Sequence, residues 1–136
     1  MKRTTKEWVE KAEDDYRTAE LLALSSEPLH DQLYFHCQQA CEKYLKALLE
    51  EVGHAVEKTH ELEDLLDRLL AHHDTALRSL RRGLGYLSQF AVGVRYPGDN
   101  ASKRQTQAAL RWAGQVRDTC RAVLGLRAPR RRLKKP

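Results

Sequence analysis

The feature that most constrains this fold is an unbroken stretch, residues 31–51, which contains neither glycine nor proline. Projected at about 100° per residue, it divides into two faces. The apolar face carries Tyr34, Cys37, Cys41, Tyr44, Leu45, Leu48 and Val52, and the opposite face carries His36, Gln39, Lys43, Lys46 and Glu50. This pattern predicts a long helix with one buried side and one solvated side. Phe35 and Leu49 form a second apolar flank, which predicts a further contact with another helix or with a partner chain.

The same periodicity predicts four more helices, at about residues 5–25, 60–71, 74–91 and 103–124. The residues expected to cap them are Thr4 with Glu7, Thr59, Asp74, and Ser102 with Gln105. Leucines at 77, 80, 84 and 87 give the fourth helix a clean apolar seam, and Gly83 and Gly85 within it indicate a close helix approach or a bend. No segment has a strand pattern, so we expect an all-α, up-and-down antiparallel bundle of four to five helices.

Length and charge divide the chain into two parts. Residues 1–125 are predicted to form one helical domain, and residues 126–136, rich in basic residues and proline, a disordered tail. The net charge of +5 arises from eight basic residues at the two ends, because the rest of the chain holds 16 basic and 19 acidic residues. The basicity therefore does not by itself predict a nucleic-acid surface on the folded body. With no apolar run long enough for a membrane span and no secretory leader, a cytoplasmic protein is expected.

The three cysteines, Cys37, Cys41 and Cys120, fall at apolar helical positions, where a reduced thiol packs as a small hydrophobe. Cys37 and Cys41 are one turn apart, but the neighbouring His36 lies on the other face. We therefore expect core packing here, with no metal site and no cofactor.

The most unusual polar stretch is Arg95-Tyr96-Pro97-Gly98-Asp99-Asn100, which lies just before the last predicted helix. A guanidinium contacts phosphate in two places, a helix start offers free N–H groups, and an aromatic ring stacks on a base. The stretch therefore predicts a site for a nucleotide or an RNA phosphate, with Arg95, Tyr96, Asp99 and Asn100 as the binding residues. The alternative is a structural role, in which Arg95 is buried against Asp14 or Asp15.

Five further polar residues are predicted to support this site: Asp15, Gln38, Gln39, Lys43 and His60. Each also has a plainer interpretation. Asp15 is either a solvated charge at the edge of its helix or a carboxylate that pairs with an arginine. Gln38 borders the core and must satisfy its amide, Gln39 and Lys43 are on the solvated face, and His60 is either packed or in contact with ligand.

Taken together, four motifs resemble the prokaryotic HEPN domain (higher eukaryotes and prokaryotes nucleotide-binding). They are Trp8, Ala12, Asp15 and Ala19; the run from Phe35 to Leu49; Thr59-His60-Glu61-Leu62 with Leu65 and Leu66; and Arg95-Tyr96-Pro97. The resemblance covers about residues 5–124. It implies a helical bundle, usually a homodimer, that often works beside a minimal nucleotidyltransferase in a toxin–antitoxin-like module. Many members are metal-independent ribonucleases, in which an Arg acts on phosphate and a His four to six residues further on acts as acid or base.

The sequence departs from that ribonuclease motif, because Asn100 stands where the His is expected and no His follows His73. An amide does not exchange protons near neutral pH. Arg68 and His72 have the required spacing, but at the end of a leucine-rich helix, so we interpret this match as coincidental. We therefore predict no catalytic residue and a binding role. The alternatives are a ribonuclease toxin that uses His60, His72 or His73, and a purely structural dimer that docks a partner through Phe35 and Leu49.

Overall fold

The computed structural model describes residues 1–56, 58–72, 75–90 and 96–127, and these form helices joined by turns and loops, with no strand among them. The elements are α1 (Arg3–Leu24), α2 (His30–Glu51), α3 (Leu62–Leu70), the 3₁₀ helix η1 (Thr75–Leu80), α4 (Arg81–Leu87) and α5 (Lys103–Val123). The predicted all-α helical bundle is confirmed. The cap expected at Asp74, Ala91 at the end of the leucine seam, and residues 128–136 of the tail predicted at 126–136 lie outside the described residues.

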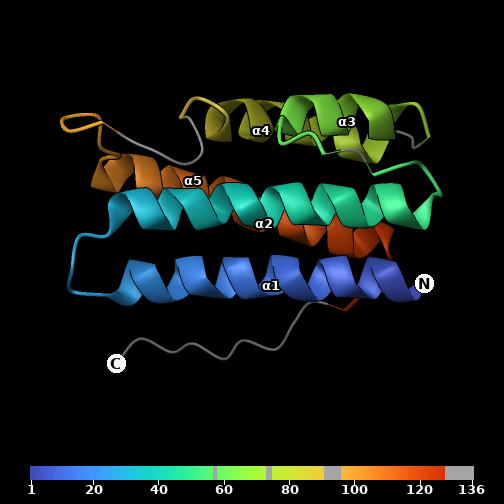
Figure 1. Ribbon diagram of the computed structural model, residues 1–136, viewed down its shortest axis with the longest axis horizontal. Helices are drawn as coiled ribbons and strands as arrows, with labels where there is room; N and C mark the ends of the chain where they lie inside the picture. The colour runs from blue at the N-terminus through green and yellow to red at the C-terminus, as the bar shows by residue number, and fades with distance from the viewer. Residues whose placement is uncertain (57, 73–74, 91–95, 128–136) are drawn as a thin grey trace.

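Helix α2 is the centre of the bundle. It packs against α1, α3, α4 and α5, and Figure 1 shows α1 on one side of it and α3 and α4 on the other. Because neighbours surround it, the helix is buried on more than the one predicted face. Of the predicted second flank, Leu49 is completely buried within the protomer, whereas Phe35 is only half-buried. Lys46, expected in solvent, is only 5% exposed, and its ammonium group lies 5.6 Å from the ring of Trp8.

The start of α1 is held by tertiary contacts, and the predicted capping box at Thr4 is wrong. Lys2 occupies the N-cap position without a side-chain cap. The hydroxyls of Thr4 and Thr5 instead donate to the carboxylates of Glu50 and Glu51 at the far end of α2, at 2.7 and 2.9 Å. The buried face of α1 is also shifted from the predicted one: Ala12 and Ala19 are buried as expected, Thr5, Val9 and Asp15 are buried too, and Trp8 and Tyr16 are half-buried while Ala23 is exposed.

The third and fourth predicted helices are shorter than expected. Helix α3 begins at Leu62 with Glu61 at its N-cap, so Thr59 does not cap it and His60 precedes it. The fourth helix is divided into η1 and α4. Its leucine seam is nevertheless confirmed, because Leu77, Leu80, Leu84 and Leu87 are all at most 1% exposed.

Helix α5 begins as predicted, with both hydrogen bonds of the Ser102–Gln105 capping box formed. Its packing against α4 explains one of the two glycines. A Cβ atom at Gly83 would lie 2.4 Å from the ring of Trp112, whereas a Cβ at Gly85 would come no closer than 3.6 Å to Glu63. Gly83 therefore permits the close approach of α4 and α5. This was one of the two predicted roles for the glycines, the other being a bend. Past α5 the chain turns at Gly125, which has a positive φ of 72°.

None of the described helices combines the length and the apolar character that a membrane span requires.

Candidate functional site

The predicted binding segment ends in an ordered turn that projects from the protein. Arg95 lies outside the described residues, but Tyr96 to Asn100 are described. The amide of Asp99 donates to the carbonyl of Tyr96 at 3.0 Å, and Gly98 has a φ of +87°. A proline followed by a glycine with positive φ is the pattern of a type II turn. The turn leaves Tyr96 74% exposed, more than any other large hydrophobic residue described.

The turn is anchored to the bundle where it meets α5. The amide of Ala101 donates to Asp31 Oδ1 at 2.7 Å, which joins the loop to the first turn of α2. Ala101 itself is buried, whereas Asp99 and Asn100 are exposed. The anchor thus fixes the base of the loop and leaves its polar tip in solvent.

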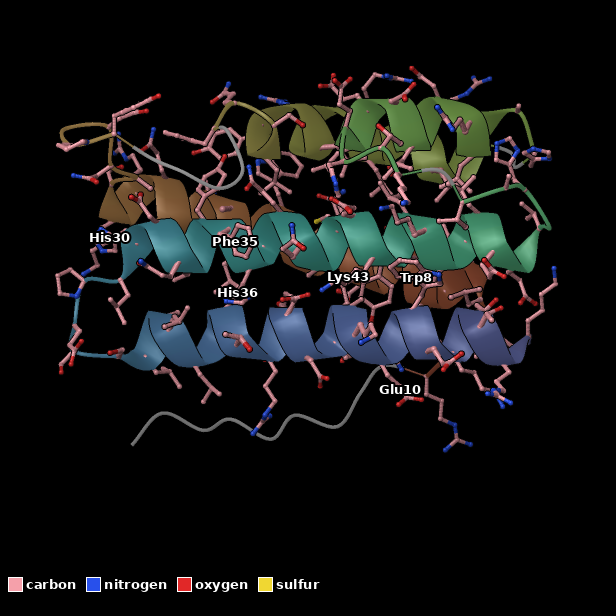
Figure 2. The ribbon with its side chains drawn as sticks, viewed as in Figure 1. Trp8, Glu10, His30, Phe35, His36 and Lys43 are labelled. Atoms are coloured by element: carbon pink, nitrogen blue, oxygen red, sulfur yellow. The ribbon has the colours of Figure 1, made fainter. Side chains whose placement is uncertain are left out.

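Asp15 is a member of a paired cluster between α1 and α2. Its carboxylate binds His36 Nδ1 at 2.8 Å and Lys43 Nζ at 2.5 Å, and Figure 2 shows both side chains extending from α2 toward α1. Asp15 is 9% exposed, so it is not the solvated edge charge of one interpretation, and its partners are not the arginine of the other. Asp15 and Lys43 therefore join α1 to α2 and are not part of the turn.

A second cluster at this interface was not predicted. Arg117 on α5 makes two hydrogen bonds to Glu13 at 2.6 and 2.8 Å, and Tyr44 donates to the same carboxylate. Burial alone raises the pKa of Glu13, but the hydrogen bonds from Arg117 and Tyr44 outweigh it and hold this pKa below its usual value of 4.5. Burial and the Glu13 carboxylate raise the pKa of Tyr44, which therefore stays a proton donor. The cluster stabilises the packing of α1, α2 and α5.

The side-chain amide of Gln38 is buried, and its nitrogen is hydrogen-bonded as expected, whereas its oxygen has no partner among the described residues. Its Nε2 donates to the carbonyls of Leu87 and Phe90, at 2.7 and 2.8 Å, and thereby holds the end of α4. Gln39, the next residue along α2, is half-buried.

His60 is placed beside a pocket between α2, the start of α3 and the end of α4. Its Nδ1 lies 2.9 Å from Glu42 Oε2, which also accepts from Lys46 at 2.8 Å. Glu42 is 5% exposed, whereas the side chain of His60 is 70% exposed, so His60 is hydrogen-bonded but not packed. The pocket has a volume of about 350 Å³ and is lined by Gln38, Glu42, His60, Glu61, Leu62, Glu63, Ser88 and Phe90.

The remaining described histidines do not form a ribonuclease-like pair with an arginine. Arg68 binds Asp64 on its own helix, and His72 Nε2 lies 3.2 Å from His54 Nδ1. In the described chain, Arg68 and His72 therefore each contact a residue other than one another. His73 lies outside the described residues.

The thiols are buried as predicted. Cys37, Cys41 and Cys120 have no exposed surface beyond 1%, and burial raises the pKa of Cys37 to about 12 and that of the other two as well. Within the described ranges, no three His, Cys, Asp or Glu residues are grouped as a metal site would require.

Apart from Gln39, the described members of the predicted site separate into three places: the turn at Tyr96, the Asp15 cluster, and the pocket that contains Gln38 and His60. Glu13 and Glu42 are the important residues that the sequence analysis missed. Gln38, Glu42 and Lys46 are spaced four apart, so their common face could have been noticed, but nothing in the sequence indicated that α3 and α4 would cover it.

Comparison with known proteins agrees with this architecture. The model of the HEPN domain matches residues 5–123. The crystal structure of an archaeal HEPN homologue superposes with a TM-score of 0.71 at 20% sequence identity, over 91% of this chain and 99% of the other. At that identity the likeness concerns the fold. No curated protein is significantly similar in sequence. Because the HEPN model covers most of the chain, the protein belongs to the HEPN domain family.

Proposed function

We propose that this HEPN domain binds the phosphate of a nucleotide or of RNA at the segment 95–100, and that it does not cleave the phosphodiester bond of the RNA. In this proposal Arg95 contacts phosphate, Tyr96 stacks on a base, and Asp99 and Asn100 shape the loop. The observation that carries the proposal is the exposure of Tyr96 on an ordered turn beside Arg95. A large aromatic ring left 74% in solvent contributes little to the core and is accessible to a ligand.

The distribution of charge supports an anionic ligand at this end of the chain. Residues 75–117 contain eight Lys and Arg residues and one acid, Asp99, whereas residues 1–72 contain nine basic and 16 acidic residues. Among the described members of this set, Arg81 pairs with Asp67 and Arg117 pairs with Glu13. Lys103 and Arg104, in the first turn of α5 just beyond the loop, are exposed. Positive charge close to the turn attracts phosphate.

The same residues argue against a ribonuclease. Acid–base cleavage requires a group that exchanges protons near neutral pH, and the position at that spacing from Arg95 is Asn100. An amide can donate a hydrogen bond to a phosphate oxygen. Asn100 therefore fits a role in holding phosphate.

We also propose, on the strength of the family, that the protein is a cytoplasmic homodimer and that it works beside a minimal nucleotidyltransferase in a toxin–antitoxin-like module. Co-expression of the two genes and light scattering of the purified product test this part. A stable complex supports the partnership, and two separately eluting proteins contradict it.

Binding is tested with fluorescently labelled ATP and a short single-stranded RNA, titrated against the wild type, Arg95→Ala and Tyr96→Ala. We expect each variant to weaken RNA binding about tenfold or more, since a stacked base contributes about 1–3 kcal/mol. Arg17→Ala is the matched control, because Arg17 is an exposed arginine on α1 in the acidic half of the chain. Equal affinity of all four proteins would contradict the proposal, and cleavage of the RNA in EDTA would contradict its non-catalytic part.

A further inference from the structure

The pocket between α2, α3 and α4 has a chemistry opposite to that of the turn. Three of the residues that line it are glutamates, Glu42, Glu61 and Glu63, and no Lys or Arg is among the described residues of its wall. Lys46 neutralises Glu42 from outside the pocket. Glu61 and Glu63, whose carboxylates lie at the rim of the pocket, have no cationic partner among the described residues.

Two buried side chains that line the pocket, Gln38 and Glu42, each carry an oxygen atom with no donor among the described residues. Gln38 must turn its nitrogen toward the carbonyls of Leu87 and Phe90, because a carbonyl only accepts, and this orientation leaves Oε1 without a partner among the described residues. Glu42 receives both of its bonds, from Lys46 and His60, on Oε2, and no described residue donates to its Oε1. Both side chains are more than nine-tenths buried. A buried acceptor without a partner costs about 1–3 kcal/mol, so these two atoms favour a ligand that donates.

The chemistry of the lining residues favours a planar cation. Gln38 and Glu42 are one helical turn apart, so their side chains emerge about 5–6 Å from each other on one face of α2. A guanidinium presents five N–H donors in a flat fork and has no acceptor, which suits a wall of acceptors. Phe90 also lines the pocket, and its ring packs edge-to-face against that of Tyr34, with 4.8 Å between the centroids. An ammonium group has neither the fork nor the flat face.

We propose that this pocket binds a guanidinium group, held by Gln38 Oε1 and Glu42 Oε1 and, at the rim, by Glu61 and Glu63. The group belongs either to a free small molecule or to an arginine side chain of another polypeptide. This inference is independent of the anion site at the turn, because the two ligands carry opposite charge.

The test is a titration of the full chain, followed by nuclear magnetic resonance, with methylguanidinium, L-arginine, L-lysine and L-citrulline. Citrulline has the shape of arginine without its charge. We expect chemical-shift changes at residues 38, 42, 61–63 and 88–90 with methylguanidinium and arginine, and affinity at least about tenfold lower for citrulline and lysine. Equal affinity for citrulline, or shifts elsewhere, would overturn the proposal. A short arginine-containing peptide that binds more tightly than free arginine would identify a polypeptide as the source.

Variants at the rim keep the test independent of folding. The double variant Glu61→Gln/Glu63→Gln changes two residues outside the core and is expected to weaken arginine binding about tenfold. Its matched control is Glu7→Gln/Glu10→Gln, which removes the same charge from the exposed side of α1, where Figure 2 shows Glu10 pointing away from the bundle. An equal loss in both double variants would show that only net charge matters and would overturn the site. Guanosine that binds more tightly than arginine would also overturn it, since a neutral base would then be the ligand.

Discussion

Helix α2 carries polar side chains on two of its sides, and the two sides differ in how completely those groups are paired. Toward α1, His36 and Lys43 close on Asp15, and Tyr44 joins Arg117 on Glu13. Toward α3 and α4, Gln38 and Glu42 each keep one oxygen without a described donor. A fully paired cluster stabilises the fold, whereas unpaired buried acceptors beside a pocket indicate a site that is completed from outside.

The largest effect is expected on the paired side. Replacing Glu13 by Ala leaves the guanidinium of Arg117 and the hydroxyl of Tyr44 without their carboxylate. Because the pair is partly exposed, we expect a loss of about 2–3 kcal/mol in the free energy of unfolding, below the value for a completely buried pair. Urea denaturation measures it. A change below about 0.5 kcal/mol would show that the cluster is not structural.

The two glycines of α4, Gly83 and Gly85, are expected to differ in how they tolerate substitution by alanine. Gly83→Ala places a methyl group against the ring of Trp112 and should destabilise the protein by about 1–3 kcal/mol. Gly85→Ala is its matched control: its methyl group would meet Glu63 at an ordinary contact distance of 3.6 Å, so helix propensity should stabilise the protein by up to about 1 kcal/mol. Thermal unfolding of both variants distinguishes the packed side from the open one, and equal shifts in the melting temperature would contradict the distinction.

The paired side also predicts a pH dependence. The folded-state pKa of Glu13 lies below 4.5, so the carboxylate adds stability above its unfolded-state value, and this contribution disappears as the pH falls through the lower folded-state value. The difference in unfolding free energy between the wild type and Glu13→Gln should therefore be constant from pH 6 to 7 and should decrease below about pH 4.5. A difference that grows on acidification would have the opposite sign and would refute the assignment.

The smallest effect is expected at the pocket. Glu61→Gln/Glu63→Gln should change the free energy of unfolding by less than about 0.5 kcal/mol, because neither residue supports the core. The same variant is expected to lose arginine binding. If it unfolds instead, the pocket is part of the folded scaffold and the contrast between the two sides of α2 is lost.

The sequence predicted those features whose causes are local. The Ser102–Gln105 box and the leucine seam from Leu77 to Leu87 depend on residues a few positions apart, and both are present. Thr4 has an equally good local pattern, but its hydroxyl binds Glu50, 46 residues away, so the cap failed. Glu13 was missed for the same reason, since Arg117 lies on another helix, and so was the contact of Glu42 with His60, although its contact with Lys46 is local. The sequence predicted which residues form the turn, but the exposure of Tyr96 could be learned only from the structure.

The measurement that tests the account most directly is a pair of titrations of one ¹⁵N-labelled sample, first with a short single-stranded RNA and then with L-arginine. We predict that RNA shifts the amide signals of residues 96 and 98–100, that arginine shifts those of residues 38, 42, 61–63 and 88–90, and that Asp15, His36 and Lys43 respond to neither. If RNA leaves the turn unchanged, or if both ligands perturb the Asp15 cluster, then the assignment of binding to the open sites and of stability to the paired ones is wrong.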